Sequence, residues 1–123
     1  MKKNLVLVTA VALVLVFSLT ACGALKDVSH MGDAFMTALT DVDHAASYQM
    51  LSEDIKAEIG GEAGWAEWAA IRNFDSWKFN SNSIENDVAT LVGNAKLDGE
   101  DYVVTLIFDK IDEVWKITGI SFE

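Results

Sequence analysis

The strongest constraint on the fold is an alternation of apolar and polar side chains through the last third of the chain. Residues 88–97 and 102–109 both repeat with a period of two. Because a β-strand projects successive side chains to opposite faces, this pattern predicts strands with one apolar face each. Turn residues at Asp98–Asp101 and Asp112-Glu113 separate the strands, and an earlier alternating segment begins at Trp77. The pattern predicts an antiparallel meander of three or four strands.

The register of this meander follows from the apolar pattern. Turns with an even number of residues bring the apolar positions of neighbouring strands onto one face, and a slip of one residue would destroy that face. The predicted inner face carries Leu91, Gly93, Ala95, Leu97, Tyr102, Val104, Leu106, Phe108, Trp115 and Ile117. We expect helices to cover it.

The residues before Phe74 have the period of helices instead. Apolar side chains from Phe35 to Val42 recur at the spacing of one helix face. Asp43 and Ser52 are the expected N-caps of two further short helices, and Gly60-Gly61 is the expected end of the second. A last helical segment is predicted within residues 64–73. The fold class is therefore α+β, with N-terminal helices packed on a C-terminal antiparallel sheet.

The first 22 residues have the organisation of an export signal. Lys2 and Lys3 precede 17 uncharged residues, fewer than the ~20 apolar residues of a typical membrane-spanning helix. The segment Leu19-Thr20-Ala21-Cys22 resembles the lipobox of bacterial lipoproteins. The resemblance implies lipidation of the Cys22 thiol, cleavage before Cys22 and a further acyl chain (such as palmitate) on the new amino terminus. The alternative is an ordinary signal or an uncleaved anchor with an incidental cysteine.

These features divide the chain into a signal peptide (1–21), a short lipid tether (22–28) and one domain (29–123). After cleavage the chain keeps seven basic and 19 acidic residues, a net charge of −12. This charge argues against nucleic-acid partners, whose phosphates are bound by Lys and Arg. It also opposes adsorption to an anionic membrane surface. We therefore expect the membrane contact to be the N-terminal lipid, on the extracytoplasmic side of a bacterial cell envelope.

The order of the predicted elements also resembles a known fold. A helix, a break containing aspartates, a short helix with Ala45-Ala46-Ser47-Tyr48, an acidic helix and strands ending in Glu113-Val114-Trp115-Lys116-Ile117 resemble the nuclear-transport-factor-2-like superfamily. The chain is most similar to its small bacterial lipoproteins of unknown function. The resemblance implies a curved sheet that wraps helices into an α+β cone with a pocket. Members include isomerases, dehydratases and many binding or accessory domains, so the fold does not select a function.

The predicted inner face supplies the candidate pocket residues. Large aromatic side chains would line the pocket, and the candidates are Trp77, Tyr102, Phe108 and Trp115. Enzymes of this superfamily typically place a carboxylate base in the pocket, but the predicted inner face offers none. Asp41, Asp43 and His44 lie at a break between helices, where aspartate is the expected cap. We therefore expect no catalytic residue, metal ligand or cofactor site from the sequence.

The opposite face of the sheet is more apolar than a solvated face requires. The candidate interface residues are Val88, Val92, Ile107, Ile120 and Phe122. A contiguous apolar patch usually marks an interface, so this face is expected to contact a second copy or an envelope protein. The leading interpretation is a lipid-anchored extracytoplasmic binding or accessory domain whose small-molecule ligand, if any, is unknown. The alternatives are a pocket enzyme of isomerase or hydratase type and a structural or dimeric interaction protein.

Overall fold

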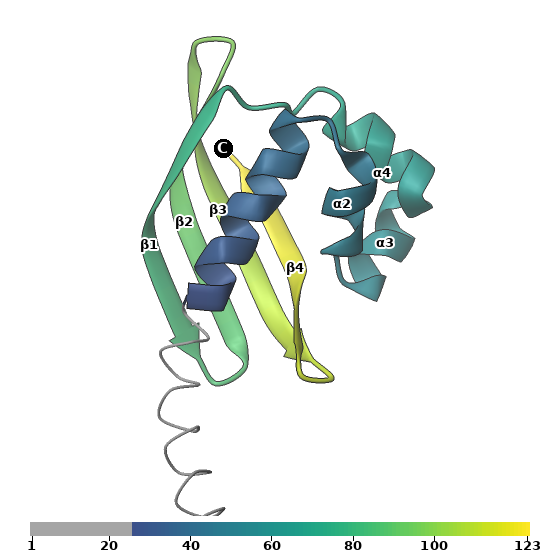
Figure 1. The fold of residues 1–123 in the computed structure, drawn as a ribbon, viewed down its shortest axis with the longest axis vertical. Coiled ribbons are helices and arrows are strands. Elements are labelled where there is room, and N and C mark those ends of the chain that lie inside the picture. Colours follow the sequence, from purple (N-terminus) through teal and green to yellow (C-terminus); the bar gives the residue numbers. More distant parts are fainter. Residues whose placement is uncertain (1–25) are drawn as a thin grey trace, which may run out of the picture.

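The computed structural model describes residues 26–123, so the predicted signal peptide and Cys22 lie outside the described residues. The described residues form four helices packed against a four-stranded antiparallel sheet (Figure 1). The helices are residues 26–40, α2 (His44–Gln49), α3 (Glu53–Ile59) and α4 (Gly61–Ala69). The strands are β1 (Ser76–Glu85), β2 (Val88–Leu97), β3 (Glu100–Ile111) and β4 (Val114–Phe122), in the spatial order β1-β2-β3-β4.

Local side-chain chemistry sets the ends of the short helices as predicted. Asp43 caps α2, where its Oδ1 accepts a hydrogen bond from the Ala46 N–H at 3.1 Å. Ser52 caps α3, where its Oγ accepts from the Ile55 N–H at 3.4 Å. The end of α3 is Gly60 at φ 89°, a left-handed conformation in which a Cβ would be strained.

The first helix begins earlier than the sequence indicated. Residues 26–28 are helical, although they were assigned to the tether over 22–28. Val28 is 1% exposed and joins the apolar stripe of Phe35 and Leu39, each a whole number of helical turns away on the same face. Burial of this side chain ties residue 28 to the domain, so residues 26–28 belong to the first helix.

The register of the sheet agrees with the prediction. Two-residue turns at Asp98-Gly99 and Asp112-Glu113 have positive φ at both positions, as hairpin turns of type I′ require. Leu91 lies opposite Leu106, on the face that the helices cover. The predicted inner face is buried except for Leu97 and Tyr102, which are half-buried.

A β-bulge in β4 changes the predicted outer face. Ile107 pairs with Gly119 while Phe108 pairs with Ile117, so Thr118 is an extra residue. An extra residue reverses the alternation, and beyond it Ile120 lies opposite Leu106 and packs against the core. Phe122 turns inward in the same way. The prediction that Ile120 and Phe122 share an outer face with Val88, Val92 and Ile107 is therefore wrong.

The two edges of the sheet differ. At the β4 edge, Leu51 forms a parallel bridge to Ile117, and the Ser52 N–H donates to the Ile117 carbonyl at 2.8 Å. At the other edge, β1 has β2 as its strand neighbour in the described part of the chain. A second bulge lies in β1, because Phe79 pairs with Gly93 and Ser81 with Val92.

The core lies between the helices and one face of the sheet. The helix over residues 26–40 crosses that face, and α2, α3 and α4 lie beside β4 (Figure 1). Phe35 contributes from the first helix and Trp65 from α4, with ring centroids 5.9 Å apart. Within residues 26–123, none of the helices has the length and apolar character needed to cross a membrane.

Candidate functional site: the outer face of the sheet

The four candidate pocket residues are not brought together. Trp77, Ala95 and Tyr102 occupy one rung of the sheet, whereas Phe108 lies six residues further along β3 than Tyr102. Six residues of a strand span about 20 Å. Phe108 is fully buried and Trp115 is 8% exposed, so both belong to the core.

Trp77 and Tyr102 make polar contacts at the edge of the core. The Trp77 Nε1–H donates to Asp33 Oδ1 at 3.1 Å and so connects β1 to the first helix. The Tyr102 hydroxyl donates to Glu100 Oε2 at 3.1 Å. This hydrogen bond and the negative charge of Glu100 raise the pKa of the Tyr102 phenol. A phenol whose pKa is raised stays protonated near neutral pH, so it is less available as a general base.

The carboxylates of the described chain lie outside the core. The buried polar side chains are Ser47 and Ser52, and both are hydrogen-bonded. Asp43 is the cap of α2, as predicted for that residue. Among residues 26–123, there is no cluster of three or more His, Cys, Asp or Glu side chains arranged to hold a metal ion.

The outer face of the sheet is the most apolar exposed surface in the described residues. Seven large hydrophobic side chains of the described residues are exposed, and five of these lie on β2, β3 and β4. Their exposed fractions run from 37% for Ile107 to 51% for Val114. Pairing places them all on the face away from the helices. The outer face, as we use the term, comprises Val88, Val92, Val103, Ile107, Ile111 and Val114.

Three of these residues agree with the prediction and three were missed. Val88, Val92 and Ile107 lie where the sequence placed them. Val103, Ile111 and Val114 occupy the same face, because Val103 pairs with Asn94 of β2 and Ile111 pairs with Val114 across the hairpin. The alternation of β3, continued to both of its ends, would have found Val103 and Ile111, and pairing across the hairpin would have added Val114.

Ile107 lies near the middle of this face, where the β4 bulge makes room for it. A Cβ at Gly119 would lie 3.1 Å from the Ile107 side chain. Ile107 therefore leans over the glycine and covers backbone of β4. The bulge that sends Ile120 inward thus also positions the apolar centre of the outer face.

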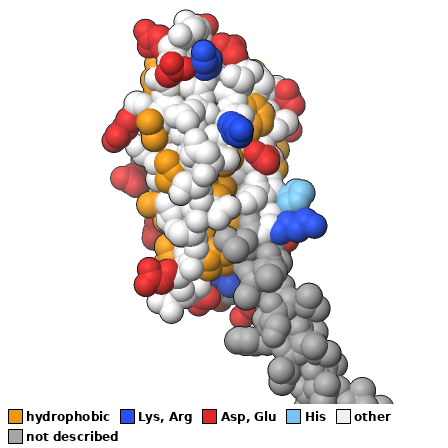
Figure 2. Space-filling model, turned by 90° about the vertical axis from the view of Figure 1, so that its left-hand side faces the viewer, with side chains coloured by type: hydrophobic (Ala, Val, Ile, Leu, Met, Phe, Trp, Pro, Cys, Tyr) orange, Lys and Arg blue, Asp and Glu red, His pale blue; other side chains and the backbone are white. Residues whose placement is uncertain are grey.

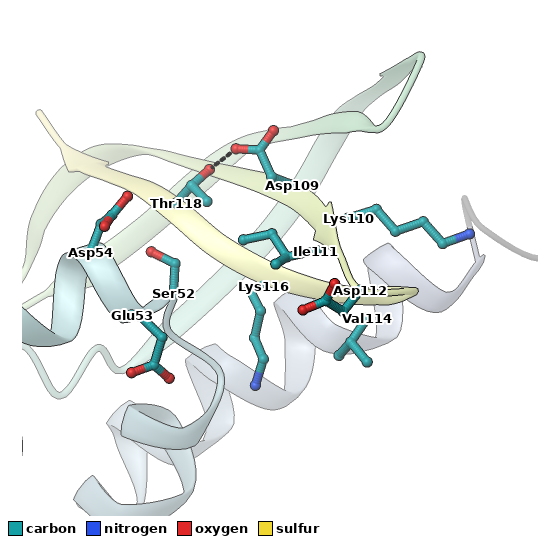
Figure 3. Close-up of a pocket in the computed structure, with 10 residues that line it drawn as sticks. All are labelled: Ser52, Glu53, Asp54, Asp109, Lys110, Ile111, Asp112, Val114, Lys116 and Thr118. Carbon is teal, nitrogen blue, oxygen red and sulfur yellow. Dashed lines mark hydrogen bonds between the residues drawn. The ribbon is translucent and has the colours of Figure 1, made fainter.

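A groove of about 730 Å³ adjoins this face at the β3–β4 hairpin (Figure 3). Residues 52–54 at the start of α3 line its other side. Within the groove, the Thr118 hydroxyl donates to Asp109 Oδ2 at 2.6 Å. Figure 3 shows Lys110 extending away from the other lining residues, and Lys116 Nζ donates to the Gln49 carbonyl at 3.1 Å. Lys110 thus points away from the groove, and the Lys116 ammonium is held by the Gln49 carbonyl. The groove therefore presents mainly carboxylates and the apolar side chains of Ile111 and Val114.

A second, smaller groove of about 390 Å³ lies between α3, α4 and β4. Trp65 and Trp68 line it and stack with ring centroids 4.8 Å apart. The Arg72 guanidinium lies 4.0 Å from the Trp68 ring centroid, and partial burial lowers the pKa of Arg72. This cation–π contact has no signature in the sequence, because Arg72 comes from the loop after α4.

The fold of the described residues is similar to that of several solved structures. No family model and no curated protein matches the chain. A structure of an NTF-2-like protein of unknown function from Silicibacter pomeroyi matches with a TM-score of 0.65 and 13% identity, covering 84% of this chain and 97% of that one. A second such protein, from Shewanella oneidensis, matches with a TM-score of 0.55 and 23% identity, covering 79% and 96%.

A third similar structure carries a more specific description. It is a putative NTF2-like transpeptidase from Campylobacter jejuni, with a TM-score of 0.52 and 13% identity, and the match covers 72% of this chain and 94% of that one. At these identities the likeness concerns the backbone alone. Residues 26–123 therefore have the nuclear-transport-factor-2-like α+β fold.

Proposed function

We propose that this chain is a lipid-anchored accessory domain of a bacterial cell envelope, which binds a protein partner through the outer face of its sheet. The observation that carries the proposal is the gathering of five of the seven exposed large hydrophobic side chains on that one face. Exposed apolar residues are normally scattered singly, whereas a contiguous patch usually marks an interaction surface.

The lipid anchor rests on the sequence around Cys22. The only cysteine of the chain follows Leu19-Thr20-Ala21 at the end of the export signal. Four peptide units separate the Cα atoms of Cys22 and Lys26, which is at most about 14 Å of extended chain. A lipid at Cys22 would hold the start of the first helix close to the membrane surface. The net charge of −12 after cleavage makes attachment by adsorption unfavourable, which supports a lipid as the anchor.

The chemistry of the partner follows from the charges around the outer face. Seven basic and 19 acidic residues lie in the described part of the chain, so most surfaces carry negative potential. The adjoining groove presents Asp54, Asp109 and Asp112 beside Ile111 and Val114. The partner surface that complements this arrangement is apolar and flanked by Lys or Arg. A second copy of the chain is as acidic as the first and offers no basic flank of this kind, which favours a different protein as the partner.

The anchor is tested with a single substitution. Mass spectrometry of the membrane fraction should show a chain that begins at a modified Cys22. Cys22→Ser should move the protein out of the membrane fraction or leave the signal uncleaved. Recovery of an intact Met1 chain from the parent, or the same membrane partition for Cys22→Ser, would contradict lipidation.

The outer face is tested by site-specific photo-crosslinking in cells. A photo-reactive residue at Val103 should give an adduct with one other protein, whose linked peptide carries apolar and basic side chains. Ile107→Lys should abolish this adduct, because it places a charge at the centre of the contact. Ile71→Lys is the matched control, since Ile71 is also exposed but lies on the loop after α4. Adducts made only of two copies of this chain, or equal loss with both variants, would overturn the proposal.

A further inference from the structure

The outer edge of β1 is the open edge of the sheet within residues 26–123. The strand is 10 residues long, and β2 is its neighbour on one side. Edge strands expose unpaired backbone N–H and C=O groups, and proteins usually protect them by shortness, proline or central lysines. β1 has a bulge at Asn80, which is a further protection of edge strands, but the strand is long, the residues in its centre, Asn80 to Ser83, are neutral, and proline is absent. Figure 2 looks onto this side of the molecule and shows few charged side chains over its middle.

The charges of β1 lie near its two ends and have opposite signs. Lys78 is near the start of the strand and Glu85 is its last residue. Neither forms a salt bridge within the described chain. The net charge of this strand is therefore zero, on a molecule whose other surfaces are mostly acidic.

The β1 bulge decides how this strand can pair with a copy of itself. Two copies related by a two-fold axis must place residues of the same face opposite each other. Phe79 pairs with Gly93 and Ser81 with Val92, so the two faces exchange at Asn80. Phe79 and Ile84 consequently share the inner face, although a regular strand would place residues five apart on opposite faces. Lys78 and Glu85 share the outer face for the same reason.

We propose that β1 pairs antiparallel with β1 of a second copy about a two-fold axis at Asn82, which joins the two sheets into one of eight strands. Counted along the β2 register, this axis places Lys78 opposite Glu85 of the second copy and Phe79 opposite Ile84 of the second copy. Ser81 then faces Ser83 of the second copy. Opposite charges and apolar pairs directly across two strands are the favourable combinations. The symmetry makes each pair occur twice.

The pairing of opposite charges and of apolar side chains favours an axis at Asn82 over an axis at the neighbouring residue, Ser81. A slip of two residues would place the axis at Ser81, with Phe79 opposite Asn82 and Lys78 opposite Ser83 of the second copy. In that register Lys78 and Glu85 have no charged partner, and the Phe79 ring lies opposite the Asn82 amide. The proposed contact is separate from the outer face, because it uses the backbone edge of β1 rather than side chains of β2, β3 and β4.

Cysteine crosslinking tests the register in the full chain in detergent, with Cys22→Ser in every variant. Opposite Cα atoms in an antiparallel pair lie about 4.5–5.5 Å apart, within the range that a disulfide spans. Asn82→Cys should therefore form a disulfide-linked dimer under mild oxidation. Ser81→Cys is the matched control and should crosslink at least about fivefold less, because its thiols are offset by two residues. Equal crosslinking of both variants, or more from Ser81→Cys, would overturn the proposed axis.

A charge exchange tests the pairing without a covalent link. Lys78→Glu and Glu85→Lys should each raise the dissociation constant of the dimer about tenfold, because each places like charges opposite one another twice. The double variant Lys78→Glu/Glu85→Lys should restore the parental value. Sedimentation of each full chain measures these constants. A monomer at every concentration, or a double variant as weak as the single ones, would show that β1 does not pair in this way.

Discussion

A buried hydroxyl organises the aromatic groups at the helical end of the core. Ser47 of α2 is fully buried, and its Oγ accepts a hydrogen bond from the Trp65 Nε1–H at 2.7 Å. The same hydroxyl lies 3.2 Å from the carbonyl oxygens of Asp43 and His44, to which it donates. Trp65 in turn stacks on Trp68. The hydroxyl thus satisfies the one polar atom of a large buried ring and fixes α2 against α4.

Ser47→Ala should lower the free energy of unfolding by about 1–3 kcal/mol, because it leaves the buried indole N–H without an acceptor. Urea denaturation followed by circular dichroism measures this change. Ser76→Ala is the control, since Ser76 is exposed at the start of β1 and lies outside the proposed pairing of residues 78–85, and surface changes usually stay within about 0.5 kcal/mol. Equal effects of the two variants would mean that the Trp65 N–H finds another partner.

At the scale of the elements, two bulges decide which side chains the sheet offers. The bulge in β4 turns Ile120 and Phe122 inward, where the Phe122 ring lies 4.8 Å from that of Phe74. The bulge in β1 exchanges its faces at Asn80, opposite a glycine of β2. A Cβ at Gly93 would collide with the Lys78 carbonyl oxygen and the Phe79 Cα. The close approach of β1 and β2 therefore requires glycine at this position.

Gly93→Ala should destabilise the domain by about 3 kcal/mol, the upper range for overpacking, because the atoms in its way belong to backbone. Gly119→Ala is a matched control on β4, where the three nearest atoms to the added methyl all belong to the Ile107 side chain, the closest at 3.1 Å. We expect it to cost about 1 kcal/mol or less. Denaturant midpoints and amide exchange of β1 measure both effects. Similar losses in both variants would contradict the close approach inferred at Gly93.

At the scale of the whole molecule, the aromatic residues stabilise a core rather than line a cavity. Phe108 and Trp115 are buried at one end of the sheet, and Tyr102 is half-buried towards the other. A domain of about 100 residues without a disulfide needs large side chains to bury enough apolar area. The binding surfaces proposed above therefore lie on the outside of the sheet and along its edge.

Trp115→Ala should lower the free energy of unfolding by about 3–5 kcal/mol, as expected for removal of a buried tryptophan. Trp77→Ala should cost clearly less, because Trp77 is half-exposed and its indole N–H bonds to the exposed Asp33 carboxylate. Circular dichroism in urea measures both. A loss below about 1 kcal/mol for Trp115→Ala would mean that this ring lines an open pocket.

The amino-acid sequence alone determined the α+β class, the caps at Asp43 and Ser52, the hairpin turns and the apolar inner face. These features depend on neighbours in the chain, through hydrogen bonds between nearby residues and through the alternation of a regular strand. The inward turn of Ile120 and Phe122 was decided only by the tertiary structure. A bulge depends on how one strand matches its partner, and its extra residue reverses an alternation that looks regular in sequence. For the same reason, the pairing of Lys78 with Glu85 across two copies follows only from the observed register of β1 on β2.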